Sequence, residues 1–101
     1  MWTGYLVAAA AGILGANGIP HFTKGITGRR HQSPWGKPSS AVLNVLWGGM
    51  NFLGAAWLAI WASTFGLELG LALTIAIIAG TGFGMLLGWW WQRDPVARGE
   101  E

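Results

Sequence analysis

The chain has 101 residues, of which 52% are hydrophobic and only 10% are charged, and its formal net charge is +2. A soluble domain carries about 25% charged residues, so this composition excludes an ordinary water-soluble protein. The chain contains no cysteine, which excludes disulfides and thiolate metal sites. Its few cations lie beside apolar segments, which argues against a nucleic-acid partner.

Three long apolar segments follow one another in the chain. Lys, Arg, Asp and Glu are absent from residues 2–20, 41–63 and 69–91. About 20 residues of this kind are enough for a helix to cross the hydrocarbon of a bilayer. The sequence therefore predicts an all-α integral membrane protein, with three transmembrane helices in a single membrane domain that spans residues 1–101.

The first apolar segment lies where a signal peptide would lie. No Lys or Arg precedes its apolar run, whereas a signal peptide has a positively charged start. We therefore expect a retained transmembrane helix. Asn17 and Gly18 weaken its last turn, and Pro20 is expected to end it because proline interrupts the hydrogen bonding of a helix.

Residues 21–39 form a basic connection between the first and second segments. They hold four of the six Lys and Arg residues, both histidines and no acid. Each Lys or Arg costs roughly 2.5–3.5 kcal/mol at the centre of a membrane helix, so this loop is expected outside the hydrocarbon. The positive-inside rule places it in the cytoplasm, together with the C-terminal tail 92–101 and its two cations. The prediction is a plasma membrane protein of the bacterial type, with its N-terminus outside and its C-terminus in the cytoplasm.

The end of the basic loop carries signals for the start of the second helix. The run from Pro34 to Pro38 is predicted to be a stiff turn that returns the chain to the membrane. Ser39 and Ser40 follow it and are residues that cap helix N-termini. The second helix is therefore expected to begin directly after them.

Small residues recur at every fourth position in the first and third segments. Such ladders let helix backbones approach closely in a membrane, where lipid supplies no hydrophobic driving force. The sequence therefore predicts packing through Gly/Ala ladders, within one chain or between copies; the alternative is a chance alignment in Gly- and Ala-rich segments. The first ladder consists of Gly4, Ala8, Gly12 and Ala16, and the other of Ala72, Ala76, Gly80, Gly84 and Gly88.

The second segment carries two amides on one face. Asn44 and Asn51 are seven positions apart, which places them on the same side of a helix. Asn51 is expected well inside the bilayer, where interhelical hydrogen bonds contribute about 0.6 kcal/mol on average. We expect it to bond a neighbouring helix; the alternative is a polar site that lines a permeation path.

Residues 24–30, Lys-Gly-Ile-Thr-Gly-Arg-Arg, combine cations, a hydroxyl and glycines. This is the composition of an anion-binding turn, but it is no Walker A loop because it lacks Gly-Lys-Ser/Thr. Lys24, Arg29 and Arg30 are therefore the candidate site for a lipid phosphate at the membrane surface. The alternative is that these three residues only anchor the topology.

The sequence offers little for catalysis or for a metal ion. His21 and His31 are ten positions apart, unlike the three- or four-residue spacing of metal ligands on a helix. They are interpreted as structural residues at the membrane interface. The acids, Glu68 and three in the C-terminal tail, are placed away from them. We therefore predict no catalytic residue, no metal site, no cofactor and no enzyme activity.

These observations predict a small non-catalytic membrane protein that acts as an oligomerising or accessory subunit of a membrane assembly. Its expected partners are membrane lipids, contacted by the basic loop, and further copies of itself or other membrane subunits. The reason is that a glycine-rich chain of three helices exposes close-packing faces that it can hardly cover alone. The alternative is an oligomeric channel or facilitator for a small solute, with Asn51 in its lumen.

Overall fold

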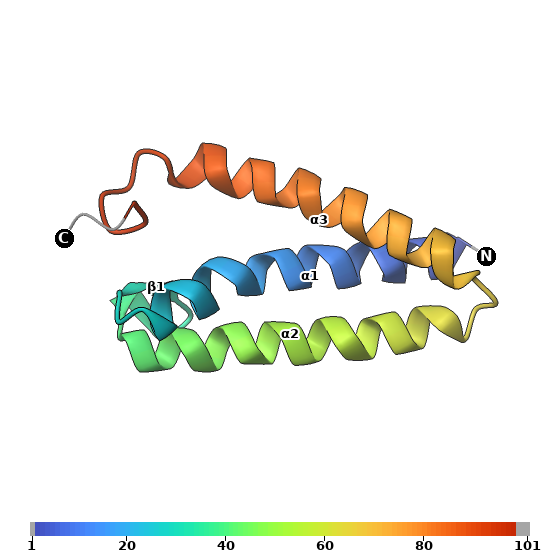
Figure 1. The fold of residues 1–101 in the computed structure, drawn as a ribbon, viewed down its shortest axis with the longest axis horizontal. Coiled ribbons are helices and arrows are strands. Elements are labelled where there is room, and N and C mark those ends of the chain that lie inside the picture. Colours follow the sequence, from blue (N-terminus) through green and yellow to red (C-terminus); the bar gives the residue numbers. More distant parts are fainter. Residues whose placement is uncertain (1, 99–101) are drawn as a thin grey trace.

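The computed structural model describes residues 2–98. Its elements are α1 (Trp2–Ile26), β1 (His31–Ser33), β2 (Gly36–Ser39), α2 (Ala41–Ser63) and α3 (Leu69–Trp91). Successive helices run in opposite directions, so the hairpin and the C-terminal tail lie at one end and the N-terminus and the α2–α3 turn at the other (Figure 1).

Three helices in the described part of the chain are long and apolar enough to cross a membrane. The molecule is therefore a mostly helical membrane protein, in agreement with the predicted all-α class. Which end faces the cytoplasm stays a prediction. The last part of the predicted tail, residues 99–101, lies outside the described residues.

The second and third helices have the bounds that the sequence predicts. Ser40 caps α2, because its Oγ accepts a hydrogen bond from the backbone N–H of Leu43 at 3.1 Å. This bond satisfies one of the amides that a helix start leaves without a partner. The turn between α2 and α3 includes Gly66, whose φ of 75° is a left-handed conformation that glycine adopts without steric cost.

The prediction that Pro20 ends the first helix is wrong, because α1 continues beyond it. A proline removes one N–H from the helix, but the following turn still packs against α2. The helix ends instead before Gly28, whose φ is 79°. The N–H of Gly28 donates to the carbonyl of Gly25 at 3.0 Å and that of Arg29 to the carbonyl of Lys24 at 2.9 Å. These two bonds are the Schellman pattern of helix C-termini.

Residues 31–39, predicted as part of a loop, form the antiparallel hairpin of β1 and β2. His31 lies opposite Ser39 and Ser33 opposite Gly36, with an irregularity in register between them. The hydroxyl oxygen of Ser39 is 2.6 Å from that of Ser33 and 3.1 Å from the carbonyl oxygen of His31. The hairpin thereby holds His31 against the end of the helices, where it is buried.

A close interface joins α1 and α2 along their length (Figure 1). A Cβ atom at Gly18 would lie 2.8 Å from the ring of Phe52 and 3.0 Å from the carbonyl oxygen of Gly48. One at Gly48 would lie 2.7 Å from the backbone nitrogen of Phe22. Only glycine allows these backbones to approach so closely.

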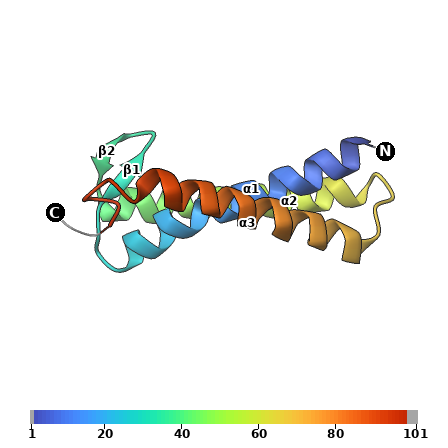
Figure 2. The same cartoon turned by 90° about the horizontal axis from the view of Figure 1, so that it is seen from above.

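A single crossing joins α1 and α3. A Cβ at Gly12 would overlap the carbonyl group of Ala76, and one at Gly80 would lie 2.7 Å from the carbonyl oxygen of Gly12. Figure 2 shows α3 passing across α1, and Figure 1 shows it leaning away from α1 toward the hairpin end. Among the described residues of α3, Gly80 alone is buried.

A small apolar core lies at the end opposite to the hairpin. Buried there are Val7, Ala8 and Ala62, with Leu58, Leu67, Ala72 and Ile75 packed against them. This core joins all three helices near the α2–α3 turn. Helix α3 is therefore held at this end and at its crossing with α1.

Candidate functional site

A group of buried polar side chains lies between α1, α2 and the hairpin. Asn44 is its centre: it is fully buried, its Oδ1 is 3.0 Å from Nδ1 of His21, and its Nδ2 donates to the carbonyl oxygen of His31 at 2.8 Å. The same Nδ2 lies within 3.2 Å of acceptors on Ser39 and Ser40. One amide thus ties together the end of α1, the hairpin and the start of α2.

The structure brings His21 and His31 together, although ten positions separate them in the sequence. Their ring centroids are 4.9 Å apart, and the ring of Trp91 meets that of His31 edge to face at 5.3 Å. Sequence spacing could not reveal this pair, because the hairpin folds His31 back onto α1. The feature of the sequence that could have indicated this polar group is Asn44, because an amide near the start of α2 needs hydrogen-bond partners once it is buried.

A second polar contact lies within the α1–α2 interface. The side-chain amide of Asn17 donates to Oδ1 of Asn51 at 2.9 Å, and Nδ2 of Asn51 donates to the carbonyl oxygen of Trp47 at 2.8 Å. Asn51 is only 2% exposed, so a lumen lined by Asn51 would require α1 and α2 to separate. The sequence interpretation of Asn17 as a helix-ending residue missed this contact.

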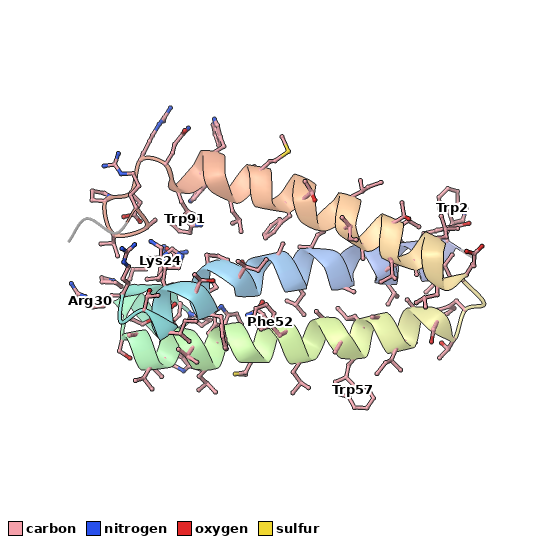
Figure 3. All side chains as sticks on the ribbon, in the orientation of Figure 1. Trp2, Lys24, Arg30, Phe52, Trp57 and Trp91 are labelled. Atoms are coloured by element: carbon pink, nitrogen blue, oxygen red, sulfur yellow. The ribbon has the colours of Figure 1, made fainter. Side chains whose placement is uncertain are left out.

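The three cations of the candidate anion site lie at the hairpin end but in different settings. Lys24 is half-buried, and its Nζ donates to the carbonyl oxygen of Val96 in the C-terminal tail at 2.9 Å. Arg29 and Arg30 are exposed in the connection between α1 and β1. Figure 3 shows Lys24 on the side of α1 that faces the end of α3, near Trp91, and Arg30 farther out.

The members of the two small-residue ladders have different surroundings. Gly12, Ala76 and Gly80 meet at the α1–α3 crossing. At Gly84 and Gly88, no described atom outside the adjacent backbone of α3 and the neighbouring residues lies within 4 Å of the position that a Cβ would take. The remaining members are placed as follows: Gly4 packs against Phe65, Ala8 and Ala72 belong to the apolar core, and Ala16 lines the space between α1 and α3.

An apolar cleft of about 670 Å³ lies where α3 leans away from α1. This volume is typical of small-molecule pockets. Two polar side chains, those of Lys24 and His31, belong to its lining at the hairpin end, beside Trp91. The apolar part of the lining includes Gly15, Ala16, Ile19, Gly84, Leu87 and Gly88.

His31 is the buried titratable group of this cleft. Its Nε2 has no hydrogen-bond partner among residues 2–98, and such an unsatisfied buried atom costs about 1–3 kcal/mol. Burial, followed by the charges of His21 and Lys24, lowers the pKa of His31 from its ordinary value of 6.5 to about 4, and the charge of Asp94 opposes this shift. The ring is therefore neutral at physiological pH, and its Nε2 can donate or accept according to the tautomer.

The fold and this end of the molecule define a class of protein: a mostly helical membrane protein with a buried polar network at one end and an apolar cleft beside it. Within residues 2–98, no group of three His, Asp or Glu side chains is arranged to hold a metal ion. No protein-family model matches the chain, and no curated protein and no solved structure is significantly similar to it.

Proposed function

We propose that this protein is a small non-catalytic membrane subunit that works by association, with a second copy of itself or with another membrane protein. The observation that carries this proposal is the placement of glycines in the helices. A glycine in a helix interior costs about 1 kcal/mol relative to alanine. In membrane helices, small residues mark the places where backbones approach each other.

Many helical glycines of this chain follow that rule within the chain itself. A Cβ would come within 3.0 Å of an atom of another helix at Gly12, Gly18, Gly25, Gly48, Gly54 and Gly80. At four others, no described atom of another helix lies within 4 Å of the Cβ position: Gly49, Gly82, Gly84 and Gly88. Of these, Gly84 and Gly88 line the cleft, whereas Gly49 and Gly82 lie outside it.

Gly82 lies on the face of α3 that we term the α3 outer face, formed by Ile78, Gly82, Met85 and Trp89. The three large side chains on this face are 67%, 73% and 58% exposed. Gly82 therefore forms a notch between them, a shape that suits the close approach of another membrane helix. This face is distinct from the ladder predicted from the sequence, whose C-terminal members line the cleft.

The substitution Gly82→Leu fills the notch and tests the association. We expect it to lower the mass of the complex extracted in mild detergent, measured by light scattering. Gly84→Leu is the matched control, because it makes the same change on the same helix but within the cleft, and it should leave the mass unchanged. A wild-type protein that is monomeric and copurifies with no membrane protein would contradict the proposal, as would an unchanged mass in Gly82→Leu.

The basic end of the molecule supports a contact with lipid headgroups as a second part of this function. Arg29, Arg30 and Lys37 are exposed there. Basic residues beside an anionic membrane surface contribute about 1 kcal/mol each. We propose that these residues hold the hairpin end against anionic headgroups while α3 contacts the protein partner.

A further inference from the structure

We propose that the cleft between α1 and α3 holds one acyl chain of an anionic phospholipid, with the phosphate group at Lys24 and His31. This site is separate from the α3 outer face and does not depend on the proposed association. It is specific to one lipid molecule, in contrast to the general contact of the exposed cations with the membrane surface.

The shape of the cleft fits a chain with a polar end. Its lining reaches from the crossing of α1 and α3 at Gly80 to Trp91 at the hairpin end. The glycines and alanines of the lining leave room, and Ile19 and Leu87 supply apolar surface for a hydrocarbon chain. Thr81 is a polar residue of the lining near the crossing, whereas Lys24 and His31 lie at the other end, where the helices end and lipid headgroups begin.

The charge at this end of the cleft favours an anion. Lys24 brings a positive charge into the lining, and its bond to the carbonyl of Val96 holds the tail across this end of the cleft. The nearby carboxylate of Asp94 is engaged within the tail, where its Oδ1 accepts a hydrogen bond from the N–H of Val96 at 3.0 Å. Arg29 and Arg30 add positive charge in the adjacent connection.

The side chain of His31 is an independent indication of a ligand. It is 2% exposed, lines the cleft, and carries the one buried side-chain polar atom without a partner in the described chain. A phosphate oxygen is a strong acceptor for an N–H donor. A phosphate at this position would satisfy Nε2 and lie beside the Lys24 ammonium group.

A helix from a second copy suits the cleft less well. An α-helix with its side chains is about 10–12 Å across, and α1 and α3 remain in backbone contact at Gly12. Inserting a helix would break this crossing, whereas a single acyl chain needs no such separation. An apolar helix would also leave Nε2 of His31 without a partner.

The first experiment counts retained lipid by native mass spectrometry after release from nanodiscs that contain equal parts of POPC and POPG. We expect one POPG molecule per wild-type chain. Gly84→Leu fills the cleft and should lower this retention by about tenfold or more, which corresponds to roughly 1.4 kcal/mol or more in binding. Gly82→Leu is the matched control outside the cleft and should retain POPG, and circular dichroism should show that both variants keep their helices.

The second experiment tests the polar end of the site. Lys24→Gln should lower POPG retention about fivefold, the factor that corresponds to roughly 1 kcal/mol for one basic residue near the surface. Lys37→Gln removes the same charge from the same end of the molecule but lies outside the cleft, so it should have a smaller effect. The ¹⁵N resonance of His31 Nε2 should shift when POPG replaces POPC in the wild type, and it should not shift in Gly84→Leu.

Several outcomes would overturn this proposal. Equal POPG retention in Gly84→Leu and Gly82→Leu would show that the retained lipid is not in the cleft. Equal retention of POPC and POPG would remove the role of charge, and retention of added oleate in place of POPG would assign the site to a free fatty acid. A dimer in the wild type that Gly84→Leu abolishes would make a second copy the occupant. In contrast, loss of association in Gly82→Leu with retained POPG would support a lipid site that is separate from the α3 outer face.

Discussion

The two interfaces of α1 differ in kind. Toward α2, α1 makes close glycine contacts, and its half-buried Asn17 and buried His21 bond the buried amides of Asn51 and Asn44 on α2. Toward α3, it makes one close approach at Gly12, and an apolar cleft follows. Because burial of apolar surface does not drive helix association in lipid, small residues alone bring two helices together at a crossing but do not close an interface. Polar partners on both helices extend the contact, as they do between α1 and α2.

Among the substitutions that test this difference between the two interfaces, Asn44→Leu is expected to lower the free energy of unfolding most. This change leaves Nδ1 of His21 without its partner, a loss that costs about 1–3 kcal/mol. It also removes the stronger of two side-chain hydrogen bonds to the carbonyl oxygen of His31, where only the Ser39 hydroxyl then remains. We expect the free energy of unfolding to fall by about 3 kcal/mol, measured by SDS titration in mixed micelles. The control Leu46→Ala changes an exposed residue of the same helix and should stay within about 0.5 kcal/mol of the wild type. Similar losses in the two variants would remove the polar network as the basis of the α1–α2 interface.

Substitution of alanine for glycine, once at the α1–α3 crossing and once in the cleft, compares how closely the two helices pack at these places. Gly12→Ala places a methyl group against the carbonyl of Ala76 and should lower the free energy of unfolding by about 1–3 kcal/mol, the usual cost of overpacking. The methyl group of Gly84→Ala has no described atom of another helix within 4 Å, and the change should be neutral or stabilising by up to about 1 kcal/mol because alanine favours helix. Equal losses at both positions would mean that α1 and α3 are in contact along the whole ladder.

The ionisation of His31 is expected to have the smallest effect on the free energy of unfolding at neutral pH. Its pKa is about 4 in the folded protein against an ordinary value of 6.5, so the unfolded chain binds more protons between these two values. The stabilisation from the neutral ring is therefore complete above pH 6.5 and is lost as the pH falls toward 4. His31→Gln removes the ring but keeps the backbone carbonyl that Asn44 bonds. It should flatten the curve of unfolding free energy against pH in this range, and an equally steep curve would assign the slope to other groups.

Local signals in the sequence were sufficient for most of the fold. The uncharged runs predicted three long helices, and Ser40 set the start of α2 through the cap that was expected. The end of α1 was missed because the Schellman bonds at Gly28 and the packing of Gly25 on α2 outweigh the single hydrogen bond that Pro20 removes. Tertiary contact decided the position of this helix end, and local propensity did not.

The candidate site depended on contacts that the sequence could not supply. An amide such as Asn51 within an apolar helix predicts a bonding partner by its chemistry alone, but not that Asn17 provides it. The approach of His21 to His31 depends on a hairpin whose strands are too short to show an alternating pattern. The cleft arises because α3 leans away from α1 after Gly80 in the chain, although the spacing of the ladder is regular throughout.

The central claim is that α1 packs closely against α2 but is separated from α3 by the cleft. Disulfide formation tests this claim most directly, since the chain contains no cysteine. A Cβ at Gly15 would lie 3.7 Å from that of Ala55, close to the value of about 3.8 Å found in disulfides. The pair Gly15→Cys and Ala55→Cys should therefore form an intramolecular disulfide in nanodiscs, seen as an oxidised monomer in non-reducing mass analysis. The pair Ala16→Cys and Gly84→Cys faces across the cleft and should remain reduced under the same oxidant. Equally complete disulfide formation in both pairs would show that α1 and α3 are closed against each other, which contradicts a cleft between them.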